Sequence, residues 1–170
     1  MAIDECEHNF EHLSKATLPS YMDEMRKNMR NPHALKDFAT EGAGVAARLK
    51  RLGLDNDFAG CYVIISKENP IYVGISRAVI SRLTHHVKGN THNSASLTYR
   101  MACKKSPHKK TRTQAMGDDT FKQAFDAAKK YLCRSSVAFL EIPNSLELYL
   151  FEAYCAMELD TKQWNKFRTH

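Results

Sequence analysis

The chain of 170 residues lacks any apolar run approaching the roughly 18–20 residues that a membrane-spanning helix requires. Its opening segment, MAIDECEHNF, is acidic and has no apolar core, so we expect no secretory signal peptide. We therefore expect no membrane partner and predict that the protein stays where it is made. With 43% hydrophobic residues, the chain can bury a real core, as one domain or one domain with an appendage.

No two cysteines are close enough to form a C-x-x-C pair, so the sequence predicts neither a zinc knuckle nor a redox motif. The cysteines number five, an odd count. Cys61, Cys133 and Cys155 stand among apolar residues, where a free thiol behaves as a small hydrophobic group. Free thiols are typical of a reducing compartment, and we predict a cytoplasmic location.

Acidic residues are absent from Asn69 to Gly117, although the chain contains 19 of them. Because the net charge is +6, this basic block carries the entire positive excess. A block of one sign is either a solvated face or a surface for a polyanion, most commonly nucleic acid. Apart from Arg82, the basic residues of the block that we expect to contact nucleic acid are Arg77, Lys88, Arg100, Lys104, Lys105, Lys109, Lys110 and Arg112.

The spacing of apolar residues predicts a helical arm followed by a small sheet with helices. Residues 3–57 have helical periodicity, interrupted at Asn31-Pro32. Residues 58–74 predict a β-hairpin, and residues 136–142 predict a third strand. Further helices are expected from Arg77, after a Ser94 cap, after an Asp118 or Asp119 cap, and at 145–159, with a basic loop at 104–117. This order predicts an α+β fold with a three-stranded, mostly antiparallel sheet flanked by helices.

Polar side chains around the hairpin form a set that suits phosphodiester chemistry. A carboxylate can hold a hard cation such as Mg²⁺, which binds a phosphate oxygen and steadies the leaving oxygen. An arginine neutralises charge on phosphorus, and a tyrosine or histidine relays a proton from water. The candidate catalytic residues are Tyr62, Tyr72, Arg82, His86, His92 and Glu152.

Each of these side chains also has a structural interpretation. Tyrosine is an ordinary strand residue, and Arg82 could bind phosphate without catalysing. Glu152 could be an edge residue of an amphipathic helix, in which case Glu147 is the rival acid. The segment HNFEH (8–12) also matches the inverted zinc-protease signature, although no clear third ligand follows it.

Four elements in order resemble the GIY-YIG nuclease family over roughly residues 58–167. They are GCY (60–62), YVG (72–74), Arg82 on the following helix, and FEAYCAMELDTKQWN, which begins at Phe151. The segments RLTHH and THNSASL also resemble homing-endonuclease members. One departure is Cys61, where the family has an apolar residue, and we expect it to change packing and not chemistry.

The resemblance implies a role for each matching residue. Tyr62 would act as general base or position water, and Tyr72 would lie at the phosphate. Arg82 would contact phosphate, and Glu152 would bind Mg²⁺ or Mn²⁺. His86 and His92 would be helpers of catalysis. The structural residues would be Gly60, Gly74 and Asn165. The implied activity is endonucleolytic cleavage of single-stranded or duplex DNA, and the alternative is a nucleic-acid-binding module that no longer cuts.

The domain organisation that we expect is a helical arm at residues 1–57 and a nuclease domain at residues 58–170. The apolar faces of the arm need a partner, either the nuclease domain or a second copy of the chain. We expect a helical cap on the chain's own nuclease domain, with a homodimer as a secondary possibility.

Overall fold

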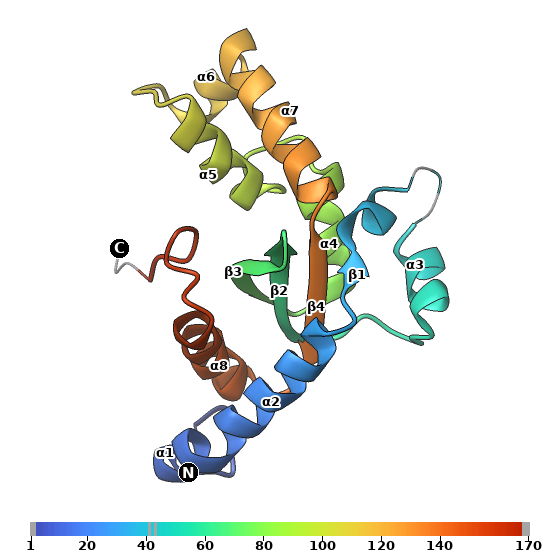
Figure 1. The fold of residues 1–170 in the computed structure, drawn as a ribbon, viewed down its shortest axis with the longest axis vertical. Helices are drawn as coiled ribbons and strands as arrows, with labels where there is room; N and C mark the ends of the chain where they lie inside the picture. The colour runs from blue at the N-terminus through green and yellow to red at the C-terminus, as the bar shows by residue number, and fades with distance from the viewer. Residues whose placement is uncertain (1–2, 41, 43, 168–170) are drawn as a thin grey trace. The chain divides into compact units, whose positions relative to one another are not determined.

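The computed structural model describes residues 3–40, 42 and 44–167 (Figure 1). The chain divides into two compact units. The first unit comprises residues 1–33, 56–79 and 136–170, and the second comprises residues 34–55 and 80–135.

The sheet has four strands in the order β1-β4-β2-β3. They are β1 (His33–Ala34), β2 (Gly60–Ser66), β3 (Asn69–Ser76) and β4 (Ser136–Glu141). The central strand β2 pairs antiparallel with both β3 and β4. The α+β fold expected from the sequence is therefore confirmed. The additional strand β1 was not expected, because two residues are too few to show an alternating pattern.

Two long helical segments pack against the sheet within the first unit (Figure 1). A short 3-10 turn (Ile3–Glu5) leads into a helical run made of α1 (Phe10–His12), a π-helical segment (Leu13–Thr17) and α2 (Leu18–Met29). The other is α8 (Ser145–Glu158). Leu18, Met22 and Met25 of α2 share one apolar core with the strands and with Phe151 and Cys155 of α8. The N-terminal part of the predicted arm thus packs on strands of the same chain.

The second unit is helical. It contains a 3-10 turn (Leu35–Ala39), α3 (Val45–Leu52), α4 (Val79–Lys88, whose first residue belongs to the first unit), α5 (Ser96–Lys105), α6 (Arg112–Met116) and α7 (Asp119–Cys133). Helices α5 and α7 pack together around Tyr99, Phe121 and Phe125. Helix α6 occupies part of the segment expected to be a loop. None of the helices in the described ranges is long and apolar enough to cross a membrane.

Candidate active site

The hairpin register places the two tyrosines on one face of the sheet. Tyr62 of β2 is opposite Gly74 of β3, and Ile64 is opposite Tyr72. Since side chains alternate along a strand, both tyrosine rings lie on the face opposite Cys61 and Val63. The ring centroids are 6.2 Å apart, and both side chains are buried. The structure therefore brings the predicted tyrosine pair together.

The two glycines of the matching tripeptides make room for the protein itself. A Cβ atom on Gly74 would lie only 2.5 Å from the hydroxyl oxygen of Tyr62 and 2.6 Å from its Cζ atom. A Cβ atom on Gly60 would lie 2.2 Å from the carbonyl oxygen of Leu140 in β4. Gly74 thus allows the Tyr62 ring to lie across β3, and Gly60 allows the close approach of β4.

Asn165 is bound to the outer edge of the hairpin. Its Oδ1 atom accepts a hydrogen bond from the Val73 N–H at 2.9 Å, and its Nδ2 atom donates to the Val73 carbonyl at 2.8 Å. Because β3 is the edge strand of the sheet that the described residues form, no described strand pairs with these backbone groups on that side. Asn165 therefore holds the segment after α8 against the strand that contains Tyr72.

Glu152 is half-buried on α8, the helix that packs against the Cys61 face of the sheet. Its charge affects Cys61, which belongs to the first tripeptide. The pKa of the Cys61 thiol is raised by burial above all, and then by Cys155 and Glu152. Cys61 is fully buried and free, so it packs as a small apolar residue. The tyrosine rings lie on the other face of the sheet, and Glu152 belongs to the same unit as the tyrosines.

Glu147, the rival acid, is engaged elsewhere. Five residues separate it from Glu152, which corresponds to about 140° around the helix. Its carboxylate accepts hydrogen bonds from the Tyr21 hydroxyl at 2.6 Å and from the Cys6 thiol at 3.7 Å. Burial and then this carboxylate raise the pKa of Tyr21. Glu147 therefore anchors the N-terminal helices to α8.

The donor set suits a magnesium-like ion that is held mainly by water and substrate. Among the described residues, no group of three or more His, Cys, Asp or Glu side chains could hold a metal ion. Mg²⁺ commonly takes only one or two protein carboxylates and completes its shell with water and phosphate oxygens. The single carboxylate of Glu152 fits that mode of binding.

The zinc interpretation of the HNFEH segment gains no support. The His8 and His12 rings are stacked with their centroids 4.2 Å apart, while Glu11 pairs with Lys15 at 2.7 Å. A zinc site needs further protein ligands, and the described part of the chain brings none to this pair.

Arg82 lies on α4 in the second unit. It is half-buried and donates hydrogen bonds to the Ser94 carbonyl at 3.3 Å and to Ser96 Oγ at 2.8 Å. These contacts tie the guanidinium to the start of α5.

The two predicted helper histidines are also in the second unit, in different environments. His86 is fully buried on the apolar side of α4. Burial first, and then Arg82, Arg100 and His85, lower the pKa of His86 to about 3, so its imidazole is neutral at pH 7. His92 is half-buried and packs edge-on against Tyr99, with ring centroids 5.9 Å apart.

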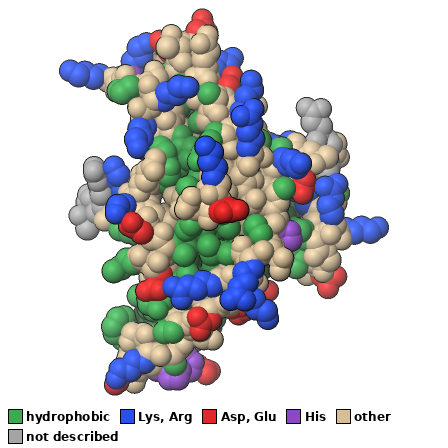
Figure 2. All heavy atoms as spheres, viewed as in Figure 1, with side chains coloured by type: hydrophobic (Ala, Val, Ile, Leu, Met, Phe, Trp, Pro, Cys, Tyr) green, Lys and Arg blue, Asp and Glu red, His purple; other side chains and the backbone are tan. Residues whose placement is uncertain are grey.

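The second unit concentrates positive charge. It contains 16 of the 25 basic residues but only 6 of the 19 acidic ones, a net charge of +10, while the first unit carries −4. Of the eight predicted nucleic-acid contacts, Arg100 is half-buried and the others are exposed; Arg77 alone belongs to the first unit. Figure 2 shows lysine and arginine side chains projecting from the surface around α5 to α7.

Some basic residues of the second unit lie outside the acid-free block, and the sequence reasoning missed them. Exposed examples on α3 and α7 are Lys50, Arg51, Lys122 and Lys130, and exposed Arg134 directly follows α7. Aspartates such as Asp55 and Asp126 lie near them along the chain, so a search for a segment without acidic residues could not reveal them. A net charge counted over each compact unit does.

Comparison with known protein families gives a match. A family model described as the GIY-YIG catalytic domain matches residues 58–167, well over half of the chain. No curated protein and no solved structure matches the chain.

Proposed function

Because the chain belongs to the GIY-YIG nuclease family, we propose that it is a divalent-metal-dependent endonuclease that hydrolyses DNA phosphodiester bonds. The observation that carries the proposal is the tyrosine pair at 6.2 Å, packed over Gly74 in the unit that also contains Glu152. The +10 charge of the second unit supports DNA as the substrate.

In this proposal the hairpin tyrosines handle the water and the phosphate. Tyr62 orients the attacking water or accepts its proton, and its ring position over Gly74 keeps the hydroxyl in one place. Tyr72, on the neighbouring strand β3, contacts a phosphate oxygen of the substrate. Asn165 limits movement of β3 through its two hydrogen bonds to Val73.

Charged side chains stabilise the transition state. Glu152 holds Mg²⁺ or Mn²⁺, which when bound supplies Lewis-acid stabilisation of phosphate and leaving oxygens. Arg82 neutralises the charge that grows on the phosphoryl oxygens; this role rests on its place in the helix after the second tripeptide. His92 assists from a polar loop. His86, being neutral and buried, assists by supporting α4 under Arg82.

A plasmid-nicking assay with and without Mg²⁺ tests the proposal, with Glu152→Gln as the decisive variant. This change keeps the shape of the side chain and removes the charge that holds the cation. We expect cleavage to disappear while DNA binding stays intact or tightens, because a negative charge near phosphate is lost. Full cleavage by Glu152→Gln would contradict the assignment of the metal ligand.

Glu147→Gln is the matched control on the same helix. It disturbs the contacts with Tyr21 and Cys6, so we expect lower stability with cleavage retained below the melting temperature. If the wild-type protein binds DNA but does not cut it with Mg²⁺ or Mn²⁺, the alternative of a non-cleaving binding module holds.

A further inference from the structure

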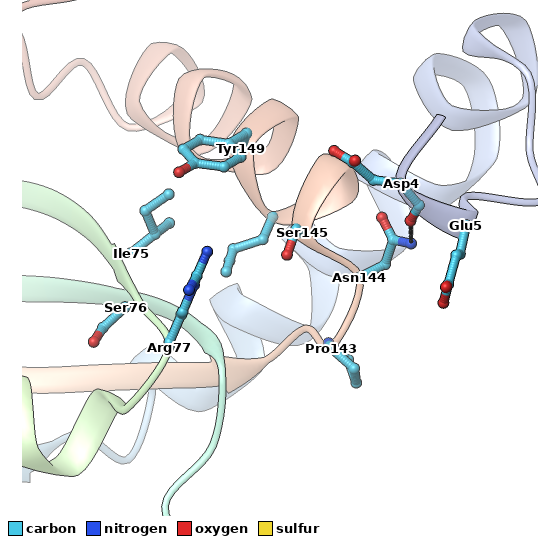
Figure 3. A pocket seen from close by; sticks show the side chains of 10 residues that line it. Asp4, Glu5, Ile75, Ser76, Arg77, Pro143, Asn144, Ser145 and Tyr149 are labelled. Carbon is cyan, nitrogen blue, oxygen red and sulfur yellow. Dashed lines mark hydrogen bonds between the residues drawn. The ribbon is translucent and has the colours of Figure 1, made fainter. Parts of the chain in front are cut away.

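An open pocket of about 700 Å³ lies between the end of β3 and the first turns of α8, within the first unit (Figure 3). Ile75 and Arg77 line it on one side, and Ser145 and Tyr149 line it from α8. Its volume is within the range of small-molecule sites, roughly 300–1,000 Å³. The mechanism proposed above assigns no role to this pocket.

The pocket is chemically polarised. Arg77 is exposed, and no described carboxylate forms an ion pair with it. Figure 3 shows its guanidinium extending into the pocket, with Ser145 at the start of α8 beyond it. Asp4 and Glu5 line the far side. An anion is therefore favoured near Arg77 and disfavoured near the two carboxylates.

Tyr149 provides an exposed aromatic surface beside this charge. Its side chain is 65% exposed, whereas Phe151 on the same helix is fully buried. The view in Figure 3 places the Tyr149 ring above the pocket, on the same side as the tip of Arg77. An exposed ring next to a cation is the combination that binds an unpaired nucleotide, by stacking on the base and pairing with the phosphate.

The pocket adjoins the candidate metal ligand. Ser145, Tyr149 and Glu152 are spaced at i, i+4 and i+7 on α8, so they share one flank of the helix. A nucleotide stacked on Tyr149 would therefore lie one helical turn from the carboxylate of Glu152. Because Ile75 pairs with Cys61, the pocket lies on the Glu152 face of the sheet, opposite the tyrosine rings.

We propose that this pocket, on the Glu152 face of the sheet, binds an unpaired nucleotide of the substrate, with its base on Tyr149 and its phosphate on Arg77 and Ser145. The inference rests on the proposed nuclease function and narrows its substrate class. A base that stacks on Tyr149 cannot remain inside a duplex. Single-stranded or branched DNA is therefore the preferred substrate. The carboxylate of Asp4 favours bases with exocyclic amino groups and repels phosphate.

The test uses the full chain and the trinucleotide pd(T-X-T), in which X is the fluorescent base 2-aminopurine, with EDTA to prevent cleavage. Stacking on Tyr149 quenches 2-aminopurine, so we expect quenching with the wild-type protein and with Tyr149→Phe, which keeps the ring. Tyr149→Ala should bind about tenfold more weakly and abolish the quenching. Arg77→Gln should weaken binding and keep quenching at saturation.

Tyr131→Ala is the matched control, because Tyr131 is another exposed tyrosine, on α7. It should bind the trinucleotide like the wild type. Equal binding and quenching by Tyr149→Ala and the wild type, or equal cleavage of duplex and single-stranded DNA by the wild type, would overturn the pocket assignment. The proposed function would survive that result if Glu152→Gln still failed to cut. Quenching that depends on Tyr149 in a protein that never cuts DNA would support the pocket and refute the nuclease proposal.

Discussion

The absence of a side chain at residue 74 determines where the Tyr62 ring lies. The ring occupies the space that a Cβ atom would need, with contacts of 2.5 and 2.6 Å to the hydroxyl oxygen and Cζ. A tyrosine ring pivots about only two torsions, so a fully buried one cannot move aside without displacing its neighbours. The glycine of the second tripeptide is thus needed for the tyrosine of the first.

We predict that Gly74→Ala lowers the free energy of unfolding by about 1–3 kcal/mol, a typical cost of overpacking a core. Cleavage should fall further than stability alone explains, because the Tyr62 hydroxyl is displaced. Urea unfolding and nicking rates measured at a temperature where both proteins are folded will check this. The control is Gly117→Ala: its Cβ would meet no atom closer than 3.6 Å, and its φ of −85° suits any residue. A harmless Gly74→Ala would refute the packing argument.

His86 gives a prediction about acid stability. The folded protein holds the pKa of His86 at about 3, below its ordinary value of 6.5, because burial and nearby arginines disfavour the charged form. Between these two values the unfolded chain binds the proton and the folded chain does not. Stability therefore falls as the pH drops from 6.5 toward 3, by about 1.4 kcal/mol per pH unit.

Urea unfolding at pH 6.5 and pH 5 measures this effect before most carboxylates titrate. Over this interval, protonation of His86 in the unfolded chain should lower the free energy of unfolding of the wild type by about 2 kcal/mol. His86→Leu should remove this contribution to the pH dependence. His85→Leu is the control, because His85 is exposed on the same helix. If both variants show the wild-type pH dependence, His86 is not the group that titrates.

At the scale of secondary-structure elements, the stability of a β-strand depends on how its edge is paired, and that of a helix depends on how its ends are capped. The outer edge of β3 is closed by Asn165, which pairs with both backbone groups of Val73. A strand edge left open costs hydrogen bonds and invites pairing with other chains. Asn165 thus protects the outer edge of the strand that contains Tyr72.

We predict that Asn165→Ala costs about 1–2 kcal/mol of unfolding free energy through the loss of two hydrogen bonds. In Asn165→Ala, hydrogen exchange at the Val73 amide should be faster than in the wild type. The neighbouring β3 amides that pair with β2 should change less. Lys166→Ala, one exposed position further, should change neither quantity. Unchanged protection of Val73 in Asn165→Ala would contradict this account.

Helix caps show where local sequence signals succeeded and where they failed. Asp118 caps α7 by accepting a hydrogen bond from the Phe121 N–H, which resolves the choice between Asp118 and Asp119. The prediction that Ser94 caps α5 was wrong: the cap residue is Ala95, and Ser94 Oγ instead bonds Thr91. The basic segment after α5 contains α6, whose capping box pairs Thr111 with Gln114.

At the scale of the whole molecule, charge and the proposed chemistry are divided between the units. The first unit contains the tyrosines and Glu152 and carries a net charge of −4, while the second carries +10. Nonspecific attraction to DNA should therefore depend on the second unit. The boundary between an arm at 1–57 and a nuclease domain at 58–170 remains a prediction, as does a homodimer.

We predict that replacing Lys104, Lys105, Lys109 and Lys110 by Gln weakens DNA binding and flattens its salt dependence. Each lost phosphate contact should remove about 0.9 from the log–log slope on duplex DNA, or about 0.7 on a single strand. Fluorescence anisotropy over a salt series will measure the slope. The matched control replaces four exposed lysines of the first unit: Lys27, Lys67, Lys162 and Lys166. Equal slopes for both variants would show that the second unit is not the electrostatic anchor.

The sequence by itself determined the elements whose signals are local. The hairpin with its tripeptides, the third strand, the helices other than α6 and the basic block could be predicted, because periodicity and charge are properties of neighbouring residues. The family resemblance followed from the same short segments and their order.

Only the tertiary structure decided which distant residues meet. In the folded chain the Tyr62 ring lies across Gly74, and the Asn165 side chain bonds to Val73. The Glu147 carboxylate accepts hydrogen bonds from Tyr21 and Cys6. It also buried His86 and paired the two residues of β1 with β4. These outcomes depend on strand register, on helix rotation and on the packing of segments up to 141 residues apart, as Cys6 and Glu147 show. No local pattern encodes such contacts, because they arise when separate elements close on one core.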